Sequence, residues 1–219
     1  MPQKTREEIL EEVTSDHLPQ MFEIELSSNS KSGESSSSTK KTKVNIVTWN
    51  ILNQCKSPDS SSAFSFGNNP WNYEESKEDF GERLDIQANQ LCRYMGEGFD
   101  IFCLQECSNE AAEKIKNELG DNFDFKTFES ESLSKNKKGK ESYTFYDKTK
   151  FNFIKSNNTF FSKNQKNPNK GVFLGLAITF QSIASEQNFV VENVHGPFNQ
   201  AKLVIDNLIE LKKIIQTSR

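Results

Sequence analysis

The sequence predicts an α/β sandwich, a fold in which two β-sheets pack face to face and helices connect some of the strands. Segments 44–49 and 100–104 have the Val-, Ile- and Phe-rich composition of buried strands. Amphipathic segments lie between these two strands and after the second, so the order is strand, helix, strand, helix. Further apolar segments with strand-like composition follow, and this alternation fits two sheets.

The first part of the chain is predicted to hold a short acidic helix or loop and then a strand. Residues 4–14 are rich in glutamate, and residues 21–26 alternate apolar and polar side chains, as a half-buried strand does. Residues 27–43 contain no large apolar side chain, so burial cannot offset the entropy lost on ordering them. We therefore predict a flexible linker at 27–43 between a tail, 1–26, and a body, 44–219.

The body is predicted to contain three amphipathic helices. They are expected at 80–94, at 109–119 before Gly120, and at 200–215, each with apolar side chains at helical spacing on one face. The remaining apolar segments predict strands at 123–129, 142–147, 151–154, 172–180 and 188–194.

Bulk composition narrows the class of protein. The chain has 219 residues, enough for one ordinary domain or for one domain and a fragment of another. A formal net charge of −4 argues against binding nucleic acid by bulk electrostatics alone. The four cysteines show no C-x-x-C spacing, and no segment approaches the roughly 18 apolar residues of a membrane span. We expect reduced thiols, no transmembrane segment and a cytoplasmic location, with export by an unreadable signal as the open alternative.

Candidate catalytic residues stand at predicted strand ends and in the tail. Hydrolysis of a phosphoester needs a cation on the phosphate oxygens, an activated water and a proton or charge for the leaving oxygen. Glu106 suits Mg²⁺, which prefers one or two carboxylates with several waters, and Asn50 could orient Glu106 or a metal-bound water. The carboxylate of Asp16 could fix the tautomer of His17 while this histidine takes a proton from water. His195 could bond a phosphate oxygen.

Each of these residues also has a simpler structural explanation. Glu106 could be a surface glutamate that caps the next helix, and Asn50 a turn residue at a strand end. His195 precedes Gly196-Pro197 and could be an ordinary loop histidine. His17 would be idle if its segment belonged to another domain.

Four short motifs contain all of these residues: SDHLP at 15–19, TWN at 48–50, LQE at 104–106 and NVH at 193–195. Both histidines of the chain fall within them. Together the motifs resemble the endonuclease/exonuclease/phosphatase superfamily of Mg²⁺-dependent phosphoesterases. The resemblance covers 13–26 and most of the body, and it implies a two-sheet α/β sandwich of that type.

The resemblance also implies a role for each residue. Glu106 binds Mg²⁺ or Mn²⁺ with support from Asn50, His195 contacts the scissile phosphate, and Asp16 and His17 activate water. The implied reaction is hydrolysis of a phosphodiester or phosphomonoester by in-line attack of metal-activated water. The implied substrate is a phosphate ester, which in this family is a nucleic acid, a nucleotide or a phospholipid head group.

The motifs depart from the family pattern in order and in number. The S-D-H motif closes the family domain but comes first here, and the family's G-D-x-N motif is missing, since Gly120-Asp121-Asn122-Phe123 has the wrong order. Either the chain is a fragment of a tandem protein, with the end of one domain at 1–26 and the first part of a second at 44–219, or it is a circular permutant. We favour the tandem fragment because residues 1–14 lack the G-D-x-N motif that a permutant needs there. We therefore expect an incomplete sandwich.

Two functions follow from these observations. The first is a Mg²⁺-dependent phosphoesterase that is slow or inactive alone, unless a complementing domain or a second copy of the chain supplies the missing aspartate. The second is a non-catalytic remnant that acts as an interaction module of a tandem phosphoesterase, with an unfinished sheet edge for a partner.

Overall fold

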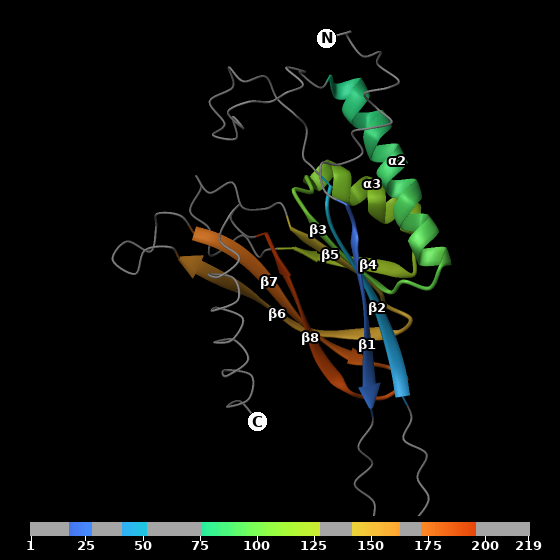
Figure 1. The fold of residues 1–219 in the computed structure, drawn as a ribbon, viewed down its shortest axis with the longest axis vertical. Coiled ribbons are helices and arrows are strands. Elements are labelled where there is room, and N and C mark those ends of the chain that lie inside the picture. Colours follow the sequence, from blue (N-terminus) through green and yellow to red (C-terminus); the bar gives the residue numbers. More distant parts are fainter. Residues whose placement is uncertain (1–17, 28–40, 52–75, 128–141, 163–171, 196–219) are drawn as a thin grey trace, which may run out of the picture.

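The computed structural model describes residues 18–27, 41–51, 76–127, 142–162 and 172–195. These residues form two packed β-sheets and two helices, as Figure 1 shows. Sheet A has the strand order β1-β2-β3-β5-β4, and sheet B has the order β6-β7-β8. Sheet A comprises β1 (Gln20–Ser27), β2 (Lys41–Asn50), β3 (Ile101–Gln105), β4 (Phe123–Thr127) and β5 (Tyr143–Asp147). Sheet B comprises β6 (Phe151–Ser162), β7 (Val172–Ser182) and β8 (Asn188–Val194), and the helices are α2 (Lys77–Gly96) and α3 (Asn109–Leu119).

The helices cover the face of sheet A that points away from sheet B (Figure 1). Leu84 and Leu91 of α2 and Ile115 of α3 are buried against Val47 of β2 and Leu104 of β3 in one apolar cluster. Each helix begins at a serine, Ser76 or Ser108, whose side chain accepts a hydrogen bond from a backbone N–H of the first turn. The predicted helices at 80–94 and 109–119 are therefore confirmed.

A second apolar cluster fills the space between the two sheets. Ile101 and Cys103 of β3 and Tyr146 of β5 pack there against Leu176 and Phe180 of β7. All five residues of β3 are buried, because the helices cover one face of this strand and sheet B covers the other. Side chains alternate between the two clusters along β2 and β3, which fixes the face of every residue at their ends.

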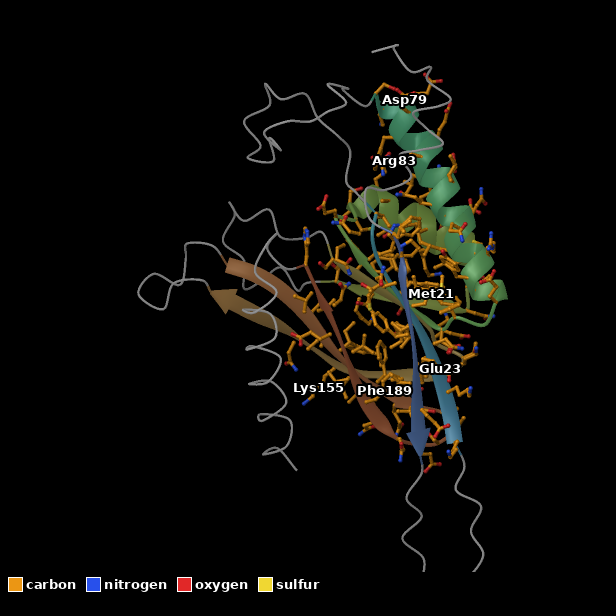
Figure 2. All side chains as sticks on the ribbon, viewed as in Figure 1. Met21, Glu23, Asp79, Arg83, Lys155 and Phe189 are labelled. Atoms are coloured by element: carbon orange, nitrogen blue, oxygen red, sulfur yellow. The ribbon has the colours of Figure 1, made fainter. Side chains whose placement is uncertain are left out.

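Strand β1 pairs antiparallel with β2 along its whole length of eight residues, from Gln20 opposite Thr48 to Ser27 opposite Lys41. Ile24 and Leu26 of β1 pack against the cluster between the sheets. Glu23 faces the other way and pairs with Lys43 at 3.0 Å; Figure 2 shows it beside Met21 at this edge of the sheet. Strands β1 and β2 therefore include residues 27 and 41–43, which the sequence predicts to lie in the linker. The rest of the predicted linker, residues 28–40, lies outside the described residues.

Most predicted strands are confirmed with small changes at their ends. The largest difference is β6, which runs to Ser162 rather than to residue 154. A β-bulge between Phe153 and Lys155 interrupts the alternation of side chains, so the sequence pattern ends there while pairing with β7 continues. The predicted helix at 200–215 and the segment 4–14 lie outside the described residues. No helix in the described ranges is long and apolar enough to cross a membrane.

Candidate active site

Three of the predicted site residues meet at one end of the sandwich. The Nδ2 of Asn50 donates a hydrogen bond of 2.9 Å to Oε1 of Glu106. The Nε2 of His195 lies 3.3 Å from the same oxygen. The side chains of Glu106 and His195 are 20% and 33% exposed, so the cluster is partly desolvated but open to a ligand from solvent.

The strand arrangement explains this meeting. Strands β2 and β3 are parallel, and Asn50 stands opposite Gln105, so the residues that follow both strands reach the same edge of sheet A. The backbone N–H of Ile51 extends this pairing with a 3.0 Å hydrogen bond to the Gln105 carbonyl. His195 directly follows β8 and approaches from sheet B.

Glu106 has an unusual backbone conformation. Its φ of +52° lies in the left-handed region, which for a residue with a side chain costs on the order of 1 kcal/mol or more. The turn redirects the chain between β3 and α3 at the point where the Glu106 carboxylate meets Asn50 and His195. Such strain is common at functional sites, and here it accompanies the residue with the strongest predicted role.

Two buried amides lie directly beneath the cluster. The Nε2 of Gln105 donates to Oδ1 of Asn193 at 2.7 Å, to Oγ1 of Thr48 at 2.9 Å and to the Cys103 carbonyl at 3.0 Å. The Nδ2 of Asn193 in turn lies 3.1 Å from the Leu104 carbonyl and 3.0 Å from the Tyr143 carbonyl. Gln105 and Asn193 belong to the LQE and NVH motifs, but nothing in the sequence alone indicates that the two amides meet.

Helix α2 holds the end of β2 from the other face. The Nη1 of Arg83 and the Nε2 of Gln87 both donate to the Ile51 carbonyl, at 2.8 and 2.7 Å. Arg83 is 1% exposed and extends from α2 toward the sheet (Figure 2). The sequence does not indicate a role for Arg83 and Gln87, because a polar residue beside an apolar helical face normally points to solvent.

The donor set is compatible with a hard divalent cation that keeps several water ligands. Glu106 supplies the carboxylate, and Mg²⁺ binds proteins through as few as one or two carboxylates. Within the described ranges, no group of three or more His, Cys, Asp or Glu side chains is arranged to hold a metal. Of the described residues, Glu106 is the carboxylate that would hold a cation at this cluster.

Asp16 and His17 lie outside the described residues, so their distance to this cluster is not defined. The described chain resumes at Leu18, directly after them.

Two other polar residues on the strands of sheet A, Asp100 and Tyr146, serve the fold. Asp100 is 3% exposed at the opposite end of β3 and pairs with Lys150 at 2.5 Å. Tyr146 packs on Phe180 with a ring distance of 4.8 Å and donates to Asp124 at 3.3 Å. Burial, and then the Asp124 charge, raise the pKa of Tyr146 to about 12.

Comparison with known proteins supports the fold. No family sequence profile matches the chain, and no curated protein sequence matches it. Among solved structures, an endonuclease/exonuclease/phosphatase family protein from Bacteroides thetaiotaomicron matches with a TM-score of 0.56 and 17% identity, over 90% of this chain and 58% of that one. A mannosyl-6-phosphatase from the same organism has a TM-score of 0.55 and 18% identity, over 80% of this chain and 59% of that one.

The human Nocturnin catalytic domain, solved with bound sulfate, has a TM-score of 0.51 and 17% identity, over 79% of this chain and 59% of that one. The chain thus spans less than two thirds of the length of all three structures. Its two-sheet α/β sandwich is therefore the fold of the endonuclease/exonuclease/phosphatase family, as the four motifs predicted.

Proposed function

We propose that this protein is a Mg²⁺-dependent phosphoesterase, with Mn²⁺ as an alternative cation, that hydrolyses a phosphodiester or phosphomonoester. The observation that carries the proposal is the contact of Asn50 and His195 with one oxygen of Glu106, at 2.9 and 3.3 Å, where strands of both sheets end. A carboxylate, an amide and an imidazole at the open end of this fold match the groups that phosphoester hydrolysis requires.

Glu106 is the residue that would hold the cation, and the hydrogen bond from Asn50 fixes its orientation. A bound Mg²⁺ supplies positive charge for the phosphate oxygens and for the leaving oxygen. His195 lies beside Glu106 and can donate an N–H to a phosphate oxygen that approaches this cluster. In the reaction, the water oxygen forms a new bond to phosphorus while the ester P–O bond breaks in line with it.

The proton of the attacking water passes to His17 in this proposal, and Asp16 holds the tautomer of that imidazole; the leaving oxygen takes a proton from solvent. The register of β1 supports this assignment. Gln20 pairs with Thr48, and in an antiparallel ladder the chain before Gln20 runs toward the residues that follow Thr48. Asn50 is the second of those residues, so the described chain begins, at Leu18, at the end of the sheet where Asn50 lies. Asp16 and His17 directly precede Leu18 in the sequence.

The same pairing bears on the domain organisation. The last strand of a separate domain is not expected to pair with β2 along its full length. Nor is it expected to bury Ile24 and Leu26 against the core of the domain that contains β2. We therefore propose that residues 20–27 belong to the same domain as β2, which favours the permuted order of motifs over the tandem fragment.

The substrate class that we propose is a phosphate ester carried by a nucleic acid, a nucleotide or a phospholipid head group, met in the cytoplasm. A complementing domain or a second copy of the chain is the proposed partner if the missing G-D-x-N aspartate limits turnover. Loss of one group from a catalytic set costs large factors in rate, because such groups act as a unit.

Hydrolysis of bis-p-nitrophenyl phosphate by the full chain tests this proposal. Turnover is expected in excess Mg²⁺ and is expected to disappear with chelator and in a Glu106→Ala variant. The matched control is Glu110→Ala, because Glu110 is an exposed glutamate in the first turn of α3 and should retain wild-type turnover. Equal, metal-independent rates in all four samples would reject the phosphoesterase and leave the interaction module as the better description.

A further inference from the structure

We infer that Gln105 and Asn193 are positioning residues that fix Glu106 and His195 relative to each other by joining the two sheets. The inference deepens the proposed function and rests on it. Gln105 directly precedes Glu106 on sheet A, and Asn193 stands two residues before His195 on sheet B. The two amides are 88 positions apart in the sequence and lie 2.7 Å apart in the fold.

The alternation of side chains brings both amides to the space between the sheets. Gln105 points to the same side of β3 as Ile101 and Cys103, and both of these belong to the cluster between the sheets. Asn193 points to the same side of β8 as Val191, which belongs to that cluster too. The amides therefore occupy the last layer of the core before the site.

The hydrogen bonds of this pair account for the donors of both amides. Three acceptors surround the two N–H groups of Gln105, and one of them is Oδ1 of Asn193. The Nδ2 of Asn193 crosses to sheet A and reaches the carbonyls of Leu104 and Tyr143, on neighbouring strands β3 and β5. The Asn193 side chain thus contacts sheet A at Leu104, the residue that directly precedes Gln105 and Glu106.

Hydrogen bonds between the buried amides specify the alignment of the two sheets, which the apolar core does not. Burial of apolar surface favours contact between the sheets, but it has no direction and tolerates small slides of one sheet over the other. Hydrogen bonds to a buried amide weaken steeply with distance and angle, and an unpaired buried amide is costly, so they specify one alignment. The alignment that they specify is the one with His195 Nε2 3.3 Å from Glu106 Oε1.

The experiment measures contact between Glu106 and His195 without metal or substrate, by ¹⁵N-detected NMR of the imidazole rings. The chain has two histidines, and a His17→Gln variant identifies the signals of each. In the wild-type background, Glu106→Gln should shift the His195 resonances because it removes the charge beside the ring. In a Gln105→Met/Asn193→Leu background, most of that shift should be lost.

The double substitution is chosen because it removes both partners. Replacing Gln105 alone leaves Oδ1 of Asn193 buried without its donor, and replacing Asn193 alone removes one acceptor of Gln105. Replacing both with apolar side chains of similar size avoids these mismatches within the pair. The matched control is Thr48→Val, which removes a hydrogen bond within sheet A. Gln105 then still has two acceptors for its two N–H groups, and the Glu106→Gln shift should persist.

An unchanged Glu106→Gln shift in the double variant would overturn the inference. If that variant does not fold, the unmodified chain decides: the Asn193 side-chain N–H protons should exchange with solvent at least about a hundredfold more slowly than those of a free amide. Exchange at the free rate would also overturn the inference.

Because neither readout involves hydrolysis, an inactive chain with the expected shifts would reject the phosphoesterase proposal alone. If the wild-type chain does hydrolyse phosphodiesters, the double variant should lose at least about tenfold in kcat with little change in KM, while Thr48→Val retains the wild-type value.

Discussion

Asn50→Asp should destabilise the metal-free protein and strengthen its binding of Mg²⁺. The substitution replaces an N–H donor by a carboxylate oxygen at a position 2.9 Å from Oε1 of Glu106. Two carboxylates at that separation would repel each other by about 6 kcal/mol at an effective dielectric constant of about 20, before any relaxation. Side-chain rotation and solvent screening reduce this value, because the cluster is partly exposed.

A net loss of about 2 kcal/mol is therefore expected without metal, including the lost charge-assisted hydrogen bond of about 1.5 kcal/mol. For a chain of this size, a loss of about 2 kcal/mol lowers Tm by roughly 4–8 °C. A divalent cation between the two carboxylates reverses the effect, since it is attracted by both and stabilises the folded state that binds it.

Thermal unfolding in chelator and in excess Mg²⁺ measures both effects. Asn50→Asp should lose stability in chelator and recover most of it, or exceed the wild type, in Mg²⁺. The control is Asn152→Asp, which adds the same charge at an exposed position of β6 and should behave alike in both buffers. An Asn50→Asp loss of equal size in both buffers would refute the metal site, and no loss in chelator would refute the contact with Glu106.

Three further predictions test the packing that supports the site. Ile24→Ser should lower the free energy of unfolding by about 1–3 kcal/mol in urea denaturation, whereas Met21→Ser on the 46% exposed Met21 should change it by less than about 0.5 kcal/mol; equal effects would contradict the integration of β1. Burial raises the pKa of Cys103 to about 12, so native iodoacetamide labelling at neutral pH should modify the more exposed Cys92 first, and labelling of both at one rate would contradict this burial. The pKa of Tyr146 is raised, so its contribution to stability is complete below about pH 10 and is lost as pH rises toward about 12; the wild type should therefore lose more stability than Tyr146→Phe between about pH 9 and about pH 11, and parallel losses would contradict the shift.

The sequence was sufficient to predict the strands that carry the site. Apolar segments with polar residues at their ends predicted β2 and β3, and parallel pairing of these strands brings Asn50 and Glu106 together. The NVH motif predicted a third residue, His195, at the same place. The strands could be predicted because a buried parallel strand has a distinct composition, and the proximity of their ends follows because parallel strands end at one edge of the sheet. The roles of the three residues stay predictions.

Contacts between distant segments could not be predicted in this way. Nothing in the composition of the LQE motif indicates that Gln105 faces another amide 88 positions away. The position of β1 beside β2 depends on tertiary pairing. The alternating sequence pattern of a strand does not indicate which other strand it pairs with. The burial of Arg83 could not be predicted either. It depends on the hydrogen bond to the Ile51 carbonyl, which the sequence pattern of α2 does not indicate.

The central claim is that Glu106 binds a divalent cation beside Asn50 and His195, and a paramagnetic titration tests it directly. Mn²⁺ bound at Glu106 should broaden the His195 imidazole resonances selectively at low occupancy, because Nε2 of His195 lies 3.3 Å from Oε1 of Glu106. The account predicts that this broadening saturates with one ion per chain, persists in Glu110→Ala and disappears in Glu106→Ala. Broadening of His195 that is unchanged in Glu106→Ala, or no broadening in the wild-type chain, would contradict it.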